Sequence, residues 1–229
     1  MLQQLQPETK KPIVYPDSDG QPMSDNTLQF QWIVTIKENL ELLFSNNPNV
    51  FVAGNLLWYP IEGNNTIRRA PDAMVVFGRP KGYRGSYKQW EENNIAPQVV
   101  FEILSPGNTI KEMANKLQFY QQYGVEEYYL YDPYKVDLGG WQRINEQLTI
   151  IEEIQGWVSP ILGIRFEIAE ELQIFTPTGE RFLTFVELGQ LNQQMEQQLQ
   201  QERQRAEQAE ARLKELEERL KSLGVDPNL

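Results

Sequence analysis

The chain contains no histidine and no cysteine among its 229 residues. Without cysteine it forms no disulfide and offers no thiolate to a metal. Without histidine it has no Ser-His-Asp triad, no Cys-His pair and no imidazole-ligated zinc. Any metal must therefore be held by oxygen atoms, which favours magnesium, manganese or calcium.

Long apolar runs are also missing. The opening residues, MLQQLQPETKKPIVYP, lack the apolar core of a secretory signal. No stretch approaches the ~20 apolar residues of a membrane span. These absences predict a cytoplasmic protein with no membrane association. The formal net charge of −11 argues mildly against a surface that binds nucleic acid everywhere.

The order of periodic segments predicts an α/β (α+β) domain with an appendage. Residues 1–24 are rich in Pro, Gln and Asp, and we expect a loosely attached arm. Residues 25–186 predict a mixed β-sheet flanked by helices, one starting near Leu28 and one capped by Thr109 and Glu112 and ended by Gly124. The expected strands lie in residues 50–60, 72–78, 97–107, 126–133, 141–144, 147–154 and 172–177.

Residues 187–229 predict a coiled-coil helix followed by the tail GVDPNL. Alternating steps of three and four connect Leu199, Glu202, Ala206, Ala209, Leu213, Leu216, Leu220 and Leu223. The stretch back to Leu188 departs from this phase. Two interpretations stay open, a single solvated helix or a pair formed with a second copy. We favour the pair, hence a homodimer, because so narrow an apolar stripe has nothing else to bury against.

The segment PQVVFEILSPG, residues 97–107, places a carboxylate in the middle of an apolar strand. In a strand Glu102 shares one face with Val100 and Leu104, and the opposite face is apolar as well. A buried, unpaired carboxylate costs several kcal/mol or changes its pKa. A cation, a metal or a proton must therefore compensate for Glu102.

Two other residues are candidates to meet Glu102. Asp72 follows a proline at the start of a strand, and two carboxylates on neighbouring strands can converge on a divalent cation. Lys116 lies beside the apolar stripe of the second helix, from where it can reach Glu102. Each has an ordinary alternative, because Asp72 can simply end a turn and the stem of Lys116 can cover the edge of the core. Lys111 is a second candidate lysine, farther from that helix face.

The segments RRAPDAMVVFG and PQVVFEILSPGNTIKEMANKLQFYQQYGVEEYYLYDP resemble the Uma-type restriction endonuclease family of the PD-(D/E)XK nuclease superfamily. The resemblance covers about residues 25–186. The family pattern is matched by Asp72 after a proline, by Glu102, Ser105 and Pro106 at a strand end, and by Lys116, Tyr120, Gly124 and Val125 in and after a helix. Glu127-Tyr128-Tyr129 replaces the usual Glu-Tyr-Trp. Leu104 stands where the superfamily usually has a lysine, so the resemblance implies that Lys116 takes that role.

This resemblance implies a restriction-endonuclease-like core and a metal-dependent DNA endonuclease. Asp72, Glu102 and the carbonyl of Ile103 would hold Mg²⁺, for which Mn²⁺ can substitute, and Lys116 would orient the attacking water. The alternative is a catalytically inactive nuclease-fold protein that acts as a binding or assembly module through its coiled coil. An enzyme acting on a small phosphorylated ligand is disfavoured, because no Gly-rich phosphate loop of known spacing is present.

Basic residues gather between Arg68 and Trp90, where six Lys and Arg stand against one acid, with aromatic residues between them. We expect this loop to face DNA, with Arg79, Lys81 and Arg84 contacting phosphates. An ordinary exposed loop is the alternative.

Three further residues have roles that spacing leaves undecided. Ser105 either binds a ligand or caps the end of its strand, and we favour the structural role. A glutamate of the first helix could join the site, and both Glu38 and Glu41 are available.

Overall fold

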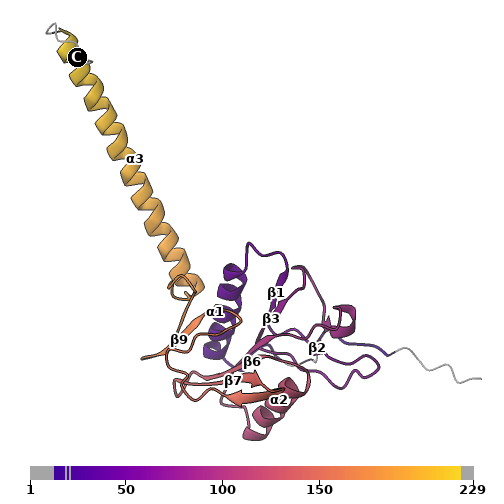
Figure 1. Ribbon diagram of the computed structural model, residues 1–229. Helices are drawn as coiled ribbons and strands as arrows, with labels where there is room; N and C mark the ends of the chain where they lie inside the picture. Colours follow the sequence, from indigo (N-terminus) through magenta and orange to yellow (C-terminus); the bar gives the residue numbers. More distant parts are fainter. Residues whose placement is uncertain (1–12, 19, 21, 223–229) are drawn as a thin grey trace, which may run out of the picture. The chain divides into compact units, whose positions relative to one another are not determined.

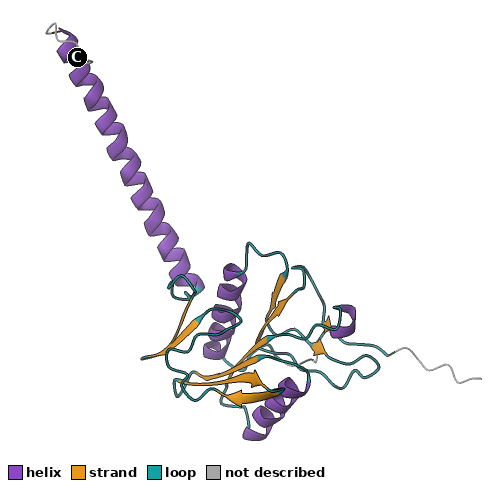
Figure 2. Cartoon of the chain, viewed as in Figure 1, coloured by secondary structure: helices purple, strands orange, loops and turns teal. Residues whose placement is uncertain are grey.

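The computed structural model describes residues 13–18, 20 and 22–222 (Figures 1 and 2). The chain divides after Phe182 into two units, the first with every strand and the second with one long helix. The helices are α1 (Thr27–Leu43), η1 (a 3-10 turn, Gln89–Glu91), α2 (Ile110–Gln122) and α3 (Phe185–Ser222). The strands are β1 (Val50–Ala53), β2 (Trp58–Tyr59), β3 (Ala73–Phe77), β4 (Tyr87–Lys88), β5 (Val99–Ile103), β6 (Glu127–Asp132), β7 (Asp137–Ile144), β8 (Gln147–Ile150), β9 (Arg165–Ile168) and β10 (Leu172–Phe175). Within the described ranges, no helix is long and apolar enough to cross a membrane.

A six-stranded mixed sheet forms the centre of the first unit, in the order β1-β3-β5-β6-β7-β8. Neighbouring strands are antiparallel except β5 and β6, which are parallel and are connected through α2. Two-stranded sheets, β9 with β10 and β2 with β4, accompany it. The predicted mixed sheet with flanking helices is confirmed.

The two faces of the sheet are covered by different elements. Alternate residues of β5 enter different apolar clusters, Phe101 in one and Val100 in the other, as the strand period requires. The Phe101 cluster includes Ile36 of α1 and Phe166 of β9. The Val100 cluster includes Tyr120 of α2 together with residues of β2 and β4. Helices α1 and α2 therefore pack on opposite faces, and the central strand β5 is buried from both sides.

Most expected elements are present, and the differences have local causes. The run 50–60 splits into two strands because Asn55 adopts a positive φ of 50°, and β2 then pairs with β4 rather than with the main sheet. The sequence signal was too weak for β4 and β9, which are short. The predicted limits of α2 are confirmed, since the Thr109 side chain accepts a hydrogen bond from the Glu112 amide and Gly124 has a φ of +90°.

The described part of the N-terminal arm is docked onto the first unit, in contrast to the loose attachment that composition predicted. The carbonyl of Pro16 accepts a hydrogen bond from the Tyr59 hydroxyl at 2.6 Å. The hydroxyl of Tyr15 accepts one from the Gly63 amide at 2.6 Å, and its ring packs edge-on against Tyr59. Residues 1–12 of the predicted arm lie outside the described residues.

Helix α3 is a single uninterrupted α-helix of 38 residues, which confirms the predicted C-terminal helix. It begins at Phe185, after a capping box in which the Thr184 amide donates to the Glu187 carboxylate at 2.8 Å. None of its residues is buried. Leu223 and the tail GVDPNL lie outside the described residues.

A partly buried charge cluster holds the loop between β3 and β5. Glu92 accepts hydrogen bonds from Arg79 and Arg84, each at 2.6 Å, and all three side chains are at most 15% exposed. Burial by itself would raise the pKa of Glu92, but hydrogen bonds from Arg84 and Arg79 outweigh it and hold the pKa below its ordinary value. The single carboxylate of Glu92 is therefore the counter-charge of both guanidinium groups.

Replacing Glu92 by Gln should lower the free energy of unfolding by about 2–4 kcal/mol, because it leaves two poorly hydrated arginines without a counter-charge. Denaturant unfolding at neutral pH measures this change. Glu91→Gln is the matched control, since Glu91 is exposed and its ion pair in the described chain is with Lys88. We expect it to cost less than about 0.5 kcal/mol.

The effect should also depend on pH. A carboxylate with a lowered pKa contributes stability above its unfolded-state pKa and loses it as the pH falls through the folded-state value. The gap between wild type and Glu92→Gln should therefore shrink in acid. A constant gap across the acidic range would show that the charge cluster is not its origin.

Candidate active site

Asp72 and Glu102 lie side by side on neighbouring antiparallel strands. Ala73 of β3 is in register with Phe101 of β5, so the residue before Ala73 faces the residue after Phe101. The Asp72 Oδ2 accepts a hydrogen bond from the Ile103 amide at 2.7 Å, which fixes its side chain across the strand gap. Asp72 is 7% exposed and Glu102 is 2% exposed. The structure thus brings together the two carboxylates that the sequence predicted.

Helix α2 supplies both partners of the Glu102 side chain. The Lys116 ammonium donates to Glu102 Oε2 at 2.8 Å, and the Tyr120 hydroxyl donates to Oε1. Lys116 and Tyr120 are four residues apart, so they lie on one face of the helix. Because α2 directly follows β5 in the chain, its inner face is held over the strand that carries Glu102. Lys116 therefore reaches the predicted pocket.

The negative charges of Asp72 and Glu102, when both are ionised, are not balanced by the single positive charge of Lys116. Burial, and then the negative charge of Glu102, raises the pKa of Asp72 well above its ordinary value. Burial would lower the pKa of Lys116, but the Glu102 carboxylate beside it raises that pKa above its ordinary value, so Lys116 stays charged. Burial and the Glu102 charge also raise the pKa of Tyr120, which keeps its hydroxyl a donor. One ammonium thus faces two buried carboxylates.

Gln29 is a site residue that sequence reasoning missed. Its side-chain amide donates to the carbonyl oxygen of Ile103 at 2.9 Å, and this carbonyl is the predicted main-chain metal ligand. A signal was available, because Gln29 lies in phase with the buried Ile33, Ile36 and Leu40 of α1. A polar residue on a buried helix face needs a polar partner, as Glu102 does in its strand.

The first-helix glutamates do not reach this site. Glu38 pairs with Lys37 at 3.0 Å, and Glu41 pairs with Lys81 at 2.6 Å. Neither lines the pocket described below. The first helix contributes Gln29 in their place.

Ser105 makes the hydrogen bonds of a structural residue. Its hydroxyl donates to the carboxylate of Asp25, and its amide donates to the Asn108 side chain at 2.8 Å. These contacts close the turn between β5 and α2 and tie it to the segment before α1. Asp25, which sequence reasoning did not select, also lines the pocket.

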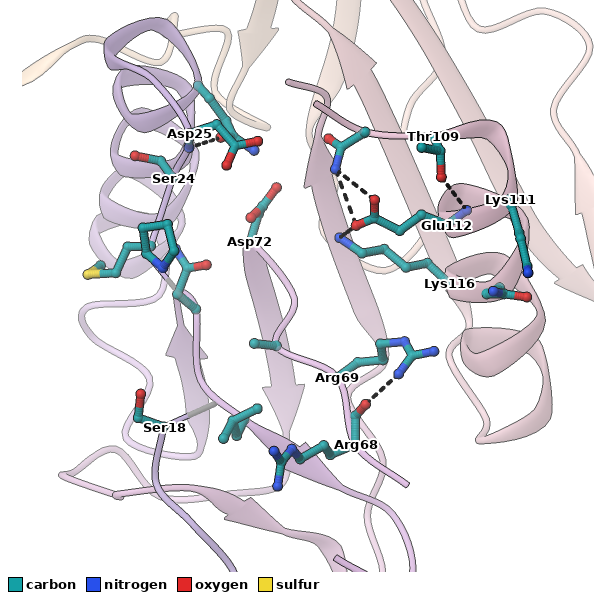
Figure 3. Close-up of a pocket in the computed structure, with 18 of the residues that line it drawn as sticks. Ser18, Ser24, Asp25, Arg68, Arg69, Asp72, Thr109, Lys111, Glu112 and Lys116 are labelled. Atoms are coloured by element: carbon teal, nitrogen blue, oxygen red, sulfur yellow. Dashed lines mark hydrogen bonds and ion pairs between the residues drawn. The ribbon is translucent and has the colours of Figure 1, made fainter. Parts of the chain in front are cut away.

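A pocket of about 720 Å³ opens over Asp72 and Lys116. Figure 3 shows Asp72 between Asp25 on the α1 side and Lys116 on the α2 side, with Arg68 and Arg69 at one end. Glu102 does not line this pocket and lies beneath it. Lys111 does line it, but no hydrogen bond or ion pair joins it to another described residue. Lys116 rather than Lys111 is therefore the lysine of the site.

The basic residues between Arg68 and Trp90 divide into two sets. Arg79 and Arg84 share the single carboxylate of Glu92, and Lys81 binds Glu41, so the three expected phosphate contacts already have acidic partners. Arg68 and Arg69, which precede Asp72, line the pocket instead. Their guanidinium groups donate to main-chain carbonyls, at 3.1 Å and 2.8 Å, and form no ion pair within the described chain. Positive charge without an acidic partner in the described chain therefore lies at one end of the pocket that Asp72 lines (Figure 3).

The donor set fits a hard divalent cation. Across the described residues, no group of three or more Asp, Glu, His or Cys side chains could hold a metal, so a cation here would depend on two carboxylates and the Ile103 carbonyl. Each of these oxygens has a second lone pair beyond the bond it accepts. Burial, and then the negative charge of Glu102, raises the pKa of Asp72, so a bound cation would favour its ionised form. Oxygen donors with excess negative charge suit Mg²⁺ or Mn²⁺.

A buried hydroxyl beside the pair is also unsatisfied. The Tyr128 hydroxyl has no hydrogen-bond partner within the described chain. Burial raises its pKa, and the charges of Glu102 and Asp72 raise it further, which places it in their field. An orphaned buried donor near the two carboxylates agrees with a site that is completed by a ligand.

Comparison with solved structures finds a distant likeness. A crystal structure described as a "putative nuclease belonging to DUF820" from Anabaena variabilis is 13% identical, with a TM-score of 0.44. The match covers 59% of this chain and 72% of that chain. No curated protein matches the chain.

Comparison with protein families gives a match over most of the first unit. Residues 18–171 match the Uma2 family, described as "Putative restriction endonuclease". The match includes Asp72, Glu102 and Lys116, together with the strands and the helix that carry them. The chain belongs to the Uma2 family of restriction-endonuclease-like proteins.

Proposed function

We propose that this protein is a Mg²⁺-dependent DNA endonuclease that hydrolyses phosphodiester bonds. The observation that carries the proposal is the meeting of Asp72, Glu102 and Lys116, from three separate segments, beside one pocket. Membership of the Uma2 family supports the same reaction class. Mn²⁺ can take the place of Mg²⁺, because both prefer oxygen ligands.

Each residue has a distinct task in this proposal. Asp72, Glu102 and the Ile103 carbonyl would hold the cation, which lowers the pKa of water and offsets charge on the phosphate. Gln29 positions the Ile103 carbonyl, and Tyr120 holds the Glu102 carboxylate in place. Lys116 lines the pocket and bears a positive charge, so it can orient the attacking water and stabilise a negatively charged transition state.

The charge around the pocket supports a phosphodiester substrate despite the acidic composition. Arg68 and Arg69 lie at one end of the pocket without a carboxylate partner among the described residues (Figure 3). Guanidinium groups bind phosphate oxygens through several donors at once. The two arginines would therefore draw the DNA backbone towards Asp72.

Cleavage of plasmid and oligonucleotide DNA with Mg²⁺ or Mn²⁺ tests the reaction. Asp72→Ala should abolish cleavage, because it removes one of the two carboxylates. Lys116→Ala should lower the rate by roughly 10²-fold or more, the typical effect of removing one group that stabilises a transition state. Initial rates under single-turnover conditions give this comparison.

Lys111→Ala is the matched control for the lysine. It lies on the same helix and lines the same pocket, yet makes no contact with Glu102, so we expect the variant to keep most of the activity. Cleavage that survives both Asp72→Ala and Lys116→Ala would refute the proposed site. Cation binding without any cleavage would favour the inactive binding module instead.

Asp72→Asn should stabilise the metal-free protein at neutral pH by roughly 1–3 kcal/mol, because it removes a charge that burial and Glu102 both disfavour. Since the folded-state pKa of Asp72 is raised, wild-type stability falls as the pH rises through that pKa. The advantage of the variant should therefore vanish in acid. Thermal unfolding in a chelator, followed across pH, measures both effects.

Added Mg²⁺ should then raise the unfolding temperature of the wild type and leave Asp72→Asn nearly unchanged. Asp137→Asn, at an exposed position, is the control that should respond to Mg²⁺ like the wild type. An equal response of wild type and Asp72→Asn would show that the cation binds elsewhere. This readout does not depend on catalytic activity.

Replacing Arg68 and Arg69 together by Ala should weaken binding to non-cleaved DNA in Ca²⁺ and lower the slope of log affinity against log salt by about 1–2. Fluorescence anisotropy over a salt series measures it. Lys81→Ala is the control, because Lys81 is already paired with Glu41. A larger effect from Lys81→Ala than from the arginine pair would instead indicate that the loop around Lys81 contacts the DNA phosphates.

A further inference from the structure

Helix α3 carries an apolar stripe that nothing in its own unit covers. The helix has no buried residue, although large apolar side chains recur along it. The exposed fractions are 58% for Met195, 54% for Leu199, 60% for Leu213, 49% for Leu216 and 38% for Leu220. So long a helix with one exposed apolar stripe requires a partner to be stable in water.

The stripe follows one heptad phase along the whole helix. If Leu199 is position a, then Ala206, Leu213 and Leu220 are also a, and Glu202, Ala209 and Leu216 are d. Towards the N-terminus the same phase puts Phe185 and Asn192 at a, and Leu188 and Met195 at d. The apparent break near Leu188 disappears once Asn192, rather than Leu191, is taken as the core residue. The unbroken helix from Phe185 to Ser222 agrees with a continuous phase.

Asn192 carries information about the partner. A single asparagine at an a position costs stability but fixes register and favours a two-stranded coil, because the two amides can pair only when they face one another. In a coil of two identical chains this requires parallel helices in register. Asn192 is the one asparagine of the helix, which makes the preference unambiguous.

The flanking charges give the same orientation independently. In a parallel coil, position g of one heptad lies opposite position e of the next heptad in the partner. Arg205 and Arg212 occupy g, and Glu210 and Glu217 occupy the e positions five residues later. Two identical helices side by side would therefore form Arg205–Glu210 and Arg212–Glu217 pairs twice over, once on each side.

An antiparallel pair would reverse this pattern. There g faces g and e faces e. In the register that places Met195 opposite Leu220, Arg205 would oppose Arg212 and Glu217 would oppose Glu196, whereas Glu210 would oppose Arg203. Like charges repel, so most of the edge pairs that attract in the parallel arrangement are lost or become repulsive in this antiparallel one.

The one acidic core position has local compensation. Glu202 at d would face its own copy, but Arg203 and Arg205 flank it on the e and g edges. Arg205 already binds Glu202 within the helix, at 2.7 Å. In the pair of helices, arginine side chains would therefore lie next to both copies of Glu202 at the helix interface.

We propose that α3 is the dimerisation element of this protein and pairs with a second copy as a parallel, in-register coiled coil. Only one residue separates Thr184, the helix cap, from the end of the first unit at Phe182. Parallel helices therefore attach both first units to the same end of the coil. If the proposed nuclease function holds, two pockets are then available for the two strands of one duplex.

Single cysteines test the orientation cleanly, because the chain has no cysteine of its own. Met195→Cys and Leu220→Cys place a thiol at a core position near either end of the helix. In the parallel coil each variant alone should form a covalent dimer under mild oxidation, seen on a non-reducing gel. In an antiparallel coil neither thiol would face its own copy, and in the register that places Met195 opposite Leu220 only a mixture of the two variants would crosslink.

Glu218→Cys, on the outer f position, is the control that should not crosslink. Sedimentation of the full wild-type chain should show a dimer at micromolar concentration. A monomer, crosslinking only in the mixture, or assembly only with a different protein would each overturn the proposal. None of these measurements depends on cleavage, so they separate its failure from that of the nuclease function.

Charge reversal tests the edge pairs. Arg212→Glu turns the two attractive Arg212–Glu217 pairs into repulsive ones and should weaken the dimer by roughly threefold or more, without touching Arg205, which also compensates Glu202. Adding Glu217→Arg to the same chain should restore it. Dimer affinity that ignores the first change, or is not restored by the second, would refute the pairing.

Discussion

The carboxylate of Glu102, placed inside strand β5 where apolar side chains cover both faces, is the constraint on which the site depends. A charge there is tolerable only with donors close by, and α2 supplies them as Lys116 and Tyr120. The position of α2 over the sheet is thus tied to the chemistry of one strand residue. In this part of the molecule, the packing of α2 against the sheet also forms the site.

The site keeps a charge imbalance that the fold does not remove. Asp72 lies beside Glu102 and accepts a hydrogen bond from the Ile103 amide, yet one lysine serves both carboxylates. Burial makes the repulsion stronger, because the surrounding protein screens charge less than water does. Such an arrangement costs stability in the absence of a cation and is typical of sites built for function rather than for the core.

Charge elsewhere in the chain is arranged for distinct purposes, which net charge alone conceals. The arginines of the loop between β3 and β5 hold Glu92 and stabilise the fold, whereas Arg68 and Arg69 remain at the pocket. In α3 the arginines and glutamates alternate on the edges of an apolar stripe. One acidic protein therefore combines a basic pocket end with a helix whose edge charges support the proposed dimer.

Local patterns in the sequence determine several structural features of this protein. The buried carboxylate in β5, the cap of α2 at Thr109, and the helical spacing that directs Lys116 inward all follow from periodicity within single segments. Asp72 was a candidate from its place after a proline at a strand start, and the family resemblance supported its partnership with Glu102. These inferences succeeded because each depended on a short stretch of chain or on a motif.

Tertiary structure alone decided which distant residues meet. Gln29 lies 74 positions before Ile103, and Glu41 and Asp25 find partners 40 and 80 positions away. No periodicity within one segment encodes such pairs, because they arise from how helices and loops are placed around the sheet. For that reason the sequence did not reveal that Arg79, Lys81 and Arg84 already have acidic partners within the fold.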